Sequence, residues 1–135
     1  MKKILVALKE DVEHRRLLAT LGELVATEPS HIDLVSLVNV TSGDDQRERR
    51  IATERSLEAI ADALRAKGHE VEVHVSFATL TAGNHIVEIA NKRGAELIVI
   101  GLAKRTRVGK ALLGSDAQSI IMHAACPVLS VRVDG

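Results

Sequence analysis

Two short, uninterrupted apolar runs constrain the fold of this chain more than any other feature. They occupy residues 4–8 and 97–100, and neither shows the alternation of apolar and polar residues expected of a strand with one exposed face. Strands of this composition are covered on both faces, as in parallel sheets that carry helices on each side. We therefore expect both runs near the centre of such a sheet.

The rest of the chain alternates between helix and strand patterns. Apolar residues recur at helical spacing in four segments, at residues 17–25, 57–64, 86–90 and 117–124. Further strands are expected at residues 32–40, 71–75 and 128–133, and the alternation of valine with Glu72 and His74 predicts a sheet edge at 71–75. Five strands alternating with four helices predict one α/β domain over residues 1–135, built on a doubly wound parallel sheet with right-handed crossovers.

Composition restricts the partners and the compartment. Lysine plus arginine equals aspartate plus glutamate at 18 each, and Phe77 is the only Phe, Tyr or Trp, so we expect no nucleic-acid partner. The first apolar run ends at Lys9 and is too short for a signal peptide or a membrane span. The single cysteine, Cys126, cannot form an internal disulfide and is interpreted as a small buried hydrophobe. We expect a cytoplasmic protein without a membrane partner.

The segment from Gly101 to Ser115 has the features of an anion-binding loop. It follows a predicted strand and precedes a predicted helix, and its basic residues are Lys104, Arg105, Arg107 and Lys110. Gly101 is expected to turn the chain, Gly114 to let backbone amides approach a ligand, and Ser115 to cap the helix. The N–H groups of a helix N-terminus bind phosphates, so this segment is predicted to hold an anion.

Two observations favour other interpretations of the same segment. Asp116, at the start of the predicted helix, stabilises the helix dipole when the site is empty and repels a phosphate on the same amides. The basic residues also fit a solvated loop in which the glycines serve only turns. No Gly-x-Ser-x-Gly elbow and no Walker loop is found in the sequence, and the six histidines show no metal-ligand spacing. We therefore predict no catalytic and no metal residues, and expect surface histidines.

The spacing of Gly101, Lys104, Gly114 and Ser115 resembles the Gly-x2-Gly-x9-Gly-Ser/Thr signature of the universal stress proteins, with Lys104 in place of the second glycine. The Cys126-Pro127-Val128 sequence that follows is similar to the same family's C-terminal half. The resemblance covers essentially the whole chain and implies a Rossmann-like sheet of order 3-2-1-4-5. In that order a ligand lies beyond the carboxyl ends of the first and fourth strands.

The same resemblance implies a ligand and the residues that bind it. The ligand is an adenine nucleotide, ATP or AMP, with its adenine ring on Val40 and with Ala7 and Leu8 at the end of the first strand. Lys9 stands where nucleotide-binding relatives carry an aspartate that contacts ribose or a metal. We therefore expect weak nucleotide binding with little dependence on magnesium.

Three functions follow from these expectations. The first is a dimeric stress-response module that binds an adenine nucleotide, and it is favoured over an enzyme. The second is an interaction protein that binds no nucleotide and acts through its dimer surface. The third is an enzyme of the related adenine-nucleotide α-hydrolase superfamily, with weak ATP hydrolysis or adenylylation. Residues 128–133 are expected at a sheet edge, where pairing with a second copy would form a homodimer.

Overall fold

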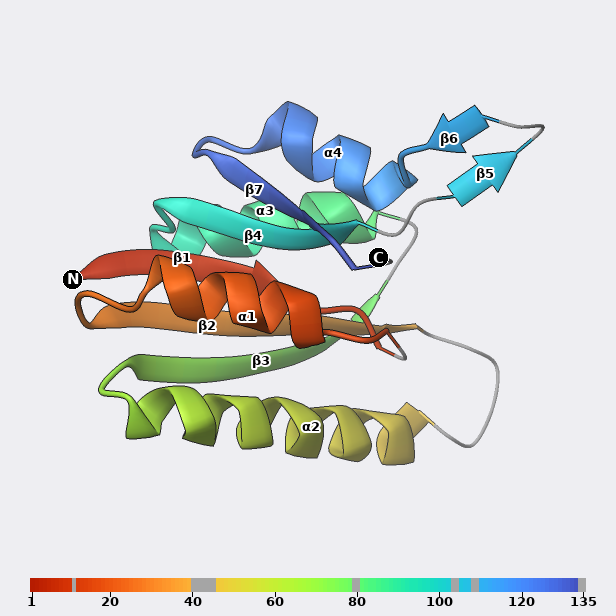
Figure 1. The fold of residues 1–135 in the computed structure, drawn as a ribbon. Helices are drawn as coiled ribbons and strands as arrows, with labels where there is room; N and C mark the ends of the chain where they lie inside the picture. Colours follow the sequence, from red (N-terminus) through yellow and green to blue (C-terminus); the bar gives the residue numbers. More distant parts are fainter. Residues whose placement is uncertain (11, 40–45, 79–80, 103–104, 108–109, 134–135) are drawn as a thin grey trace.

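The computed structural model describes residues 1–10, 12–39, 46–78, 81–102, 105–107 and 110–133. A five-stranded parallel sheet runs in the order β3-β2-β1-β4-β7, and a two-stranded antiparallel sheet, β5 and β6, lies apart from it (Figure 1). The strands are β1 Lys2–Ala7, β2 Ser30–Asn39, β3 Glu70–Ala78, β4 Leu97–Leu102, β5 Arg105–Arg107, β6 Lys110–Leu112 and β7 Val128–Arg132. The helices are α1 Arg15–Leu24, α2 Gln46–Ala66, α3 Ala82–Arg93 and α4 Ser115–His123.

This architecture confirms the predicted fold class. The order 3-2-1-4-5 is correct, with β7 as the predicted fifth strand, and β3 lies at the predicted edge. Helices α1 and α2 cover one face of the sheet, and α3 and α4 cover the other (Figure 1). Within the described ranges, no helix combines the length and the apolar character needed to cross a membrane.

The two apolar runs form the centre of the sheet because successive side chains of a strand point to opposite faces. In β1, Ile4 and Val6 pack into the core under α1 and α2, while Leu5 packs into the core under α3 and α4. In β4, Val99 packs into the core under α1 and α2, and Ile98 packs into the core under α3 and α4. A polar residue at any of these positions would be buried, which is why both runs are uninterrupted.

The segment from Gly101 to Ser115 differs from the prediction at a hairpin, at Gly101 and at the start of α4. It contains a hairpin, in which Thr106 pairs with Ala111. Gly101 does not turn the chain but lies inside β4, where it pairs with Val131. A Cβ on Gly101 would lie 2.9 Å from Cγ1 of Val133, so the glycine permits close packing instead of a turn.

The start of α4 is also one residue earlier than predicted. Gly114 is the N-cap, with an extended backbone of φ −62° and ψ 153°, and Ser115 is the first helical residue. The prediction that Ser115 caps the helix is therefore wrong. Asp116 is the second residue of the helix and still lies in the first turn, as expected.

Cys126 follows α4 and packs against the core under α3 and α4, as predicted for a small hydrophobe. It is half-buried, and burial raises the pKa of the Cys126 thiol. A raised pKa favours the protonated thiol over the reactive thiolate.

Candidate functional site

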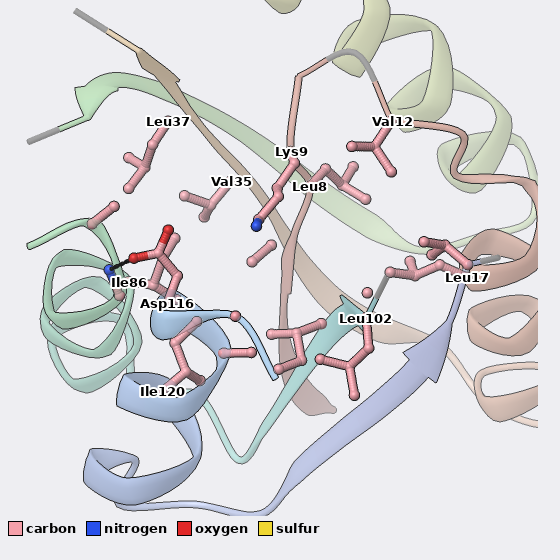
Figure 2. Close-up of a pocket in the computed structure, with 18 of the residues that line it drawn as sticks. Leu8, Lys9, Val12, Leu17, Val35, Leu37, Ile86, Leu102, Asp116 and Ile120 are labelled. Atoms are coloured by element: carbon pink, nitrogen blue, oxygen red, sulfur yellow. Dashed lines mark hydrogen bonds between the residues drawn. The ribbon is translucent and has the colours of Figure 1, made fainter. Parts of the chain in front are cut away.

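A cavity of about 390 Å³ opens at the carboxyl ends of β1 and β4 (Figure 2). These two strands are neighbours in the sheet, and their outgoing connections run to opposite faces, to α1 and to α4. This is the topological switch point, where open α/β sheets bind ligands. The volume falls within the range of small-molecule sites, which is about 300–1,000 Å³.

The cavity has apolar walls and a few polar side chains. Its aliphatic lining comes from every layer of the fold and includes Val35, Leu37, Ile86, Ile100, Leu102 and Ile120. Polar side chains lie at Lys9, Glu10, His14 and Asp116. In Figure 2 the side chain of Lys9 points into the cavity, between β2 and the start of α4. An apolar cavity with a few converging polar groups is typical of a binding site for a small organic molecule.

The structure brings six of the nine predicted site residues together. The lining of the cavity includes Ala7, Leu8, Lys9, Gly101, Gly114 and Asp116. Ser115 is exposed at the start of α4, next to Gly114. Val40 and Lys104 lie outside the described residues, as do the side chains of Arg105, Arg107 and Lys110.

Gly114 is open to the cavity. A Cβ added at this position would meet no heavy atom within 4 Å. The first N–H groups of a helix have no carbonyl partner inside the helix, and they carry the positive end of its dipole. The first turn of α4 therefore supplies backbone donors to the cavity beside a residue without a side chain.

Asp116 has a role that the sequence did not predict. Its Oδ1 accepts a hydrogen bond from the backbone N–H of Gly83, in the first turn of α3, at 3.2 Å. The carboxylate thus stabilises the N-terminus of a different helix from the one that carries it. The sequence shows a glycine at this position of α3, but its partner is 33 residues away. The contact itself therefore could not be predicted from the sequence.

Gly83 also sets the distance between α3 and α4. An added Cβ would lie 2.8 Å from the carbonyl oxygen of Asp116 and 2.9 Å from Cβ of Ser119. Nearby, the hydroxyl of Ser119 donates a hydrogen bond to Oδ1 of Asn84 at 2.6 Å. The two helices that border the cavity are therefore in direct backbone contact at this point.

We expect Gly83→Ala to destabilise the protein by about 1–3 kcal/mol, because the added methyl group clashes with backbone that cannot rotate away. Urea denaturation measures the effect. The matched control is Gly22→Ala in α1, where a Cβ meets no heavy atom within 4 Å and alanine is the better helix former by about 1 kcal/mol. Equal stability of the Gly83→Ala and native proteins would contradict this close contact.

Three of the histidines, His31, His69 and His74, differ from the predicted surface positions, whereas His123 is exposed as predicted. His69 is buried, and its Nδ1 accepts the backbone N–H of Ser30 at 3.1 Å. His31 and His74 are partly buried and lie against the carboxylate of Asp33. The sequence did not reveal this grouping because its members are on neighbouring strands.

Taken together, the sheet order and the position of the cavity define the class of protein. It is a Rossmann-like α/β domain with a cavity of small-molecule size at its switch point. The sequence profile of the universal stress protein family matches residues 1–132. The chain belongs to the universal stress protein family.

Individual relatives agree with this assignment. A universal stress protein of Mycolicibacterium smegmatis is 31% identical over 99 residues, which cover 73% of this chain and 75% of that protein. One from Methanocaldococcus jannaschii is 35% identical over 95 residues, which cover 61% of this chain and 56% of that protein. This chain thus spans little more than half the length of the second relative.

Solved structures show the same fold. The universal stress protein from Archaeoglobus fulgidus is 27% identical with a TM-score of 0.75, and the match covers 97% of this chain and 98% of that one. The structure of the universal stress protein from the same organism in complex with dAMP matches with a TM-score of 0.65 at 24% identity, over 97% and 98% of the two chains.

Proposed function

We propose that this protein is a dimeric stress-response module that binds an adenine nucleotide, ATP or AMP, and is not primarily an enzyme. The observation that carries the proposal is the cavity at the ends of β1 and β4, into which the first turn of α4 opens beside Gly114. An apolar chamber next to free backbone donors suits a ligand with a flat apolar ring and an anionic tail. The dAMP complex of a protein with the same fold supports this ligand class.

We assign the ligand an orientation from the residues that line the cavity. The phosphates are assigned to the start of α4, near Gly114 and Ser115, where the helix N-terminus attracts an anion. The adenine ring is assigned to the carboxyl end of β2, whose Val35 and Leu37 line the cavity and which leads directly into Val40. In this orientation the ring lies on aliphatic side chains and the charge lies on backbone amides.

The charged groups of the cavity point to weak binding that is independent of magnesium. Lys9 points into the cavity and offers an ammonium group to a phosphate, but it cannot ligate a cation (Figure 2). Asp116 is the acidic group nearest the proposed phosphates, and its Oδ1 already accepts the N–H of Gly83. A carboxylate beside a phosphate also lowers affinity. Neither residue therefore favours a metal-bridged triphosphate.

Calorimetric titration tests this function directly. We expect the native protein to bind ATP, ADP or AMP with a dissociation constant above about 1 µM, corresponding to less than about 8 kcal/mol, and to bind equally well without magnesium. In the variant Lys9→Asp with Lys104→Gly, we expect tighter ATP binding that requires magnesium. Submicromolar binding of magnesium-ATP by the native protein, weakened in the double variant, would contradict this interpretation of both lysines.

A second candidate function keeps the fold and omits the nucleotide. It is favoured by Lys9, which replaces the family's acidic residue and points into the cavity. In that case the protein acts through its dimer surface, and no adenine nucleotide gives a titration signal. Incubation with ATP followed by product analysis distinguishes both candidates from a hydrolase, because only a hydrolase forms ADP or AMP.

A further inference from the structure

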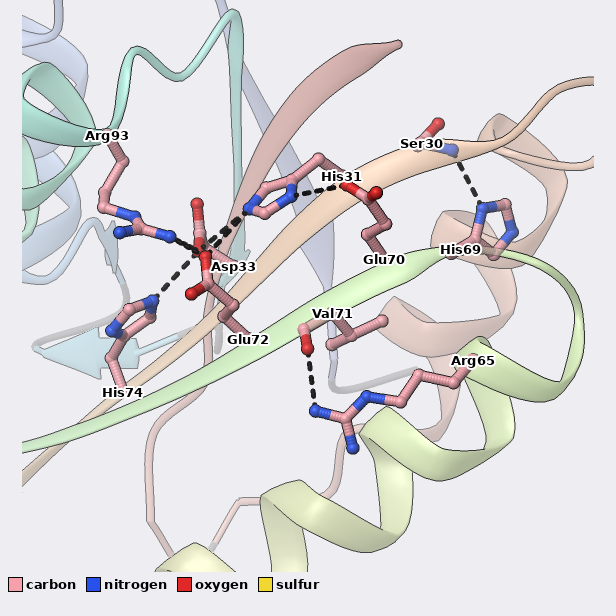
Figure 3. A network of polar contacts seen from close by, with 10 residues as sticks. All are labelled: Ser30, His31, Asp33, Arg65, His69, Glu70, Val71, Glu72, His74 and Arg93. Atoms are coloured by element: carbon pink, nitrogen blue, oxygen red, sulfur yellow. Dashed lines mark hydrogen bonds and ion pairs between the residues drawn. The ribbon is translucent and has the colours of Figure 1, made fainter.

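A cluster of ionisable side chains lies on the sheet face opposite α2, at β2 and β3 (Figure 3). In β2, Ile32 and Leu34 pack under α1 and α2, so Asp33 between them points to the other face. In β3, Val71 and Val75 likewise place Glu72 and His74 on that face. None of the cluster residues lines the cavity at the switch point, so the cluster is separate from the proposed nucleotide site.

Asp33 is the centre of the cluster. Its side chain is only 2% exposed, and its Oδ1 lies 2.9 Å from Nε2 of His74 and 3.4 Å from Nε2 of His31. A buried carboxylate requires a cationic or hydrogen-bonding partner on every side. Figure 3 shows the side chains of His31, His74 and Arg93 directed toward it.

Glu72 completes a set of donor atoms that converge. Its Oε2 lies 3.2 Å from Nε2 of His31, and the nitrogen and oxygen atoms of His31, Asp33 and Glu72 all lie within 4.8 Å of one another. Tetrahedral Zn²⁺ binds imidazole nitrogen and carboxylate oxygen at about 2.0–2.2 Å, which places neighbouring donors about 3.3 Å apart. The separations of 3.2 Å between His31 and Glu72 and of 3.4 Å between His31 and Asp33 are close to that spacing.

His31 is also held as a metal ligand would be. Its Nδ1 lies 3.4 Å from Oε2 of Glu70, on the side of the ring away from Asp33. Without a metal, the N–H of Nε2 can be donated to Asp33 or Glu72. In the other tautomer, Nδ1 donates its N–H to Glu70, and Nε2 then has the lone pair that a metal ion between it and the two carboxylates would bind. A carboxylate that orients a histidine in this way is the usual outer partner of a metal-bound imidazole.

The charge of the cluster fits a divalent cation. The cluster contains three carboxylates, those of Asp33, Glu70 and Glu72, and one guanidinium, that of Arg93. Arg93 Nη2 lies 3.2 Å from Oδ1 of Asp33 and also pairs with Glu72. Its side chain comes from the end of α3 and is 34% exposed, so it can move into solvent. Arg93 is thus the internal competitor of a bound ion.

We propose that this cluster binds a divalent transition-metal ion of the Zn²⁺ type. The ligands are Nε2 of His31 and the carboxylates of Asp33 and Glu72, His74 supports Asp33 from outside this set, and binding displaces the guanidinium of Arg93. An imidazole donor favours Zn²⁺, Co²⁺ or Ni²⁺ over Mg²⁺, which prefers oxygen ligands. No sequence motif marks the site, because the contacts His31–Glu70 and Asp33–His74 span 39 and 41 residues.

The test uses the full, tag-free chain after chelator treatment. Zn²⁺ is titrated against a chromophoric chelator, Co²⁺ binding is followed by its visible absorption, and Mg²⁺ serves as the ion that should not compete. We expect one Zn²⁺ per chain, with binding at least about tenfold weaker in His31→Gln and in Glu72→Gln. The matched control is His123→Gln, which changes an exposed histidine of α4 outside the cluster and should leave the affinity unchanged.

Arg93→Met distinguishes a metal site from an ion-pair network. If the cluster binds metal, removing the guanidinium strengthens Zn²⁺ binding at least about tenfold, because the competing cation is gone. If the cluster is only structural, Arg93→Met lowers stability without any gain in affinity. The proposal is overturned by native protein that binds no stoichiometric Zn²⁺, or by equal affinities in the His31, Glu72 and His123 variants. Glu72 is on an edge strand and half exposed, so its variant remains informative if His31→Gln does not fold.

Discussion

Gly114→Val is expected to weaken adenine-nucleotide binding by roughly 30-fold while the protein remains folded. The branched side chain would extend into the space in front of the first turn of α4, and it would cut the phosphates off from about two backbone donors. Each lost hydrogen bond costs about 1 kcal/mol, and 1.4 kcal/mol is a tenfold change in affinity. The fold tolerates the change, because the position has an extended backbone and no heavy atom within 4 Å of a Cβ. Calorimetry with ATP and AMP measures the loss.

Leu113→Val is the matched control for this experiment. Leu113 is exposed, immediately precedes Gly114 and is not among the residues that line the cavity. Valine at this position leaves the approach to the α4 amides open, so we expect affinity within about twofold of native. Thermal denaturation of both variants establishes that any loss of binding is not a loss of fold. Unchanged binding in Gly114→Val would show that the phosphates lie elsewhere.

Ser130→Pro is expected to convert a homodimer into a folded monomer. Among the described strands, β7 pairs with β4 alone, so its other edge is available for a second copy. Ile121 and Met122 of α4 are exposed apolar side chains. Val133 donates its N–H to Leu102 at 2.9 Å, and alternate residues of a parallel strand face the same neighbour. The N–H of Ser130 therefore points away from β4, and proline removes a donor from both strands of a two-fold pair.

Light scattering at micromolar concentration measures this effect. The native protein should give twice its chain mass of 14.5 kDa, and Ser130→Pro should give the chain mass itself. Val131→Pro is the matched contrast, because Val131 directs its N–H toward β4, and proline at this position should destabilise the sheet itself. A native monomer would contradict dimerisation through β7, and a dimeric Ser130→Pro would place the interface elsewhere.

The other edge strand, β3, is less suited than β7 to form the dimer interface. Glu70 and Glu72 lie on the same face of β3, and Glu72 forms ion pairs with His31 and Arg93. Pairing of β3 with its own copy would bring these like charges together, which opposes association. β7 contributes only Arg132 as a charged residue within its length.

The amino-acid sequence alone determined the fold class and the order of its elements. The runs at residues 4–8 and 97–100 can be recognised as central strands, because burial on both faces excludes polar residues at every position. The helical stripes are readable because residues three and four apart share one face, as Leu17 and Leu21 do. These patterns are local, and each depends only on neighbouring residues. The strand order and the location of the site followed from the family resemblance.

The roles of the individual glycines and charged residues depend on the tertiary structure. Gly101 packs against Val133, Gly83 touches α4, and Asp116 binds Gly83, although none of these pairs is close in sequence. The grouping of His31, Asp33 and Glu72 likewise depends on the register between β2 and β3, which places Asp33 opposite Glu72. A shift of that register by one residue would move Glu72 to the face under α2 and separate the three donors. Contacts of this kind depend on how helices and strands pack against one another, and no pattern of neighbouring residues in the sequence predicts them.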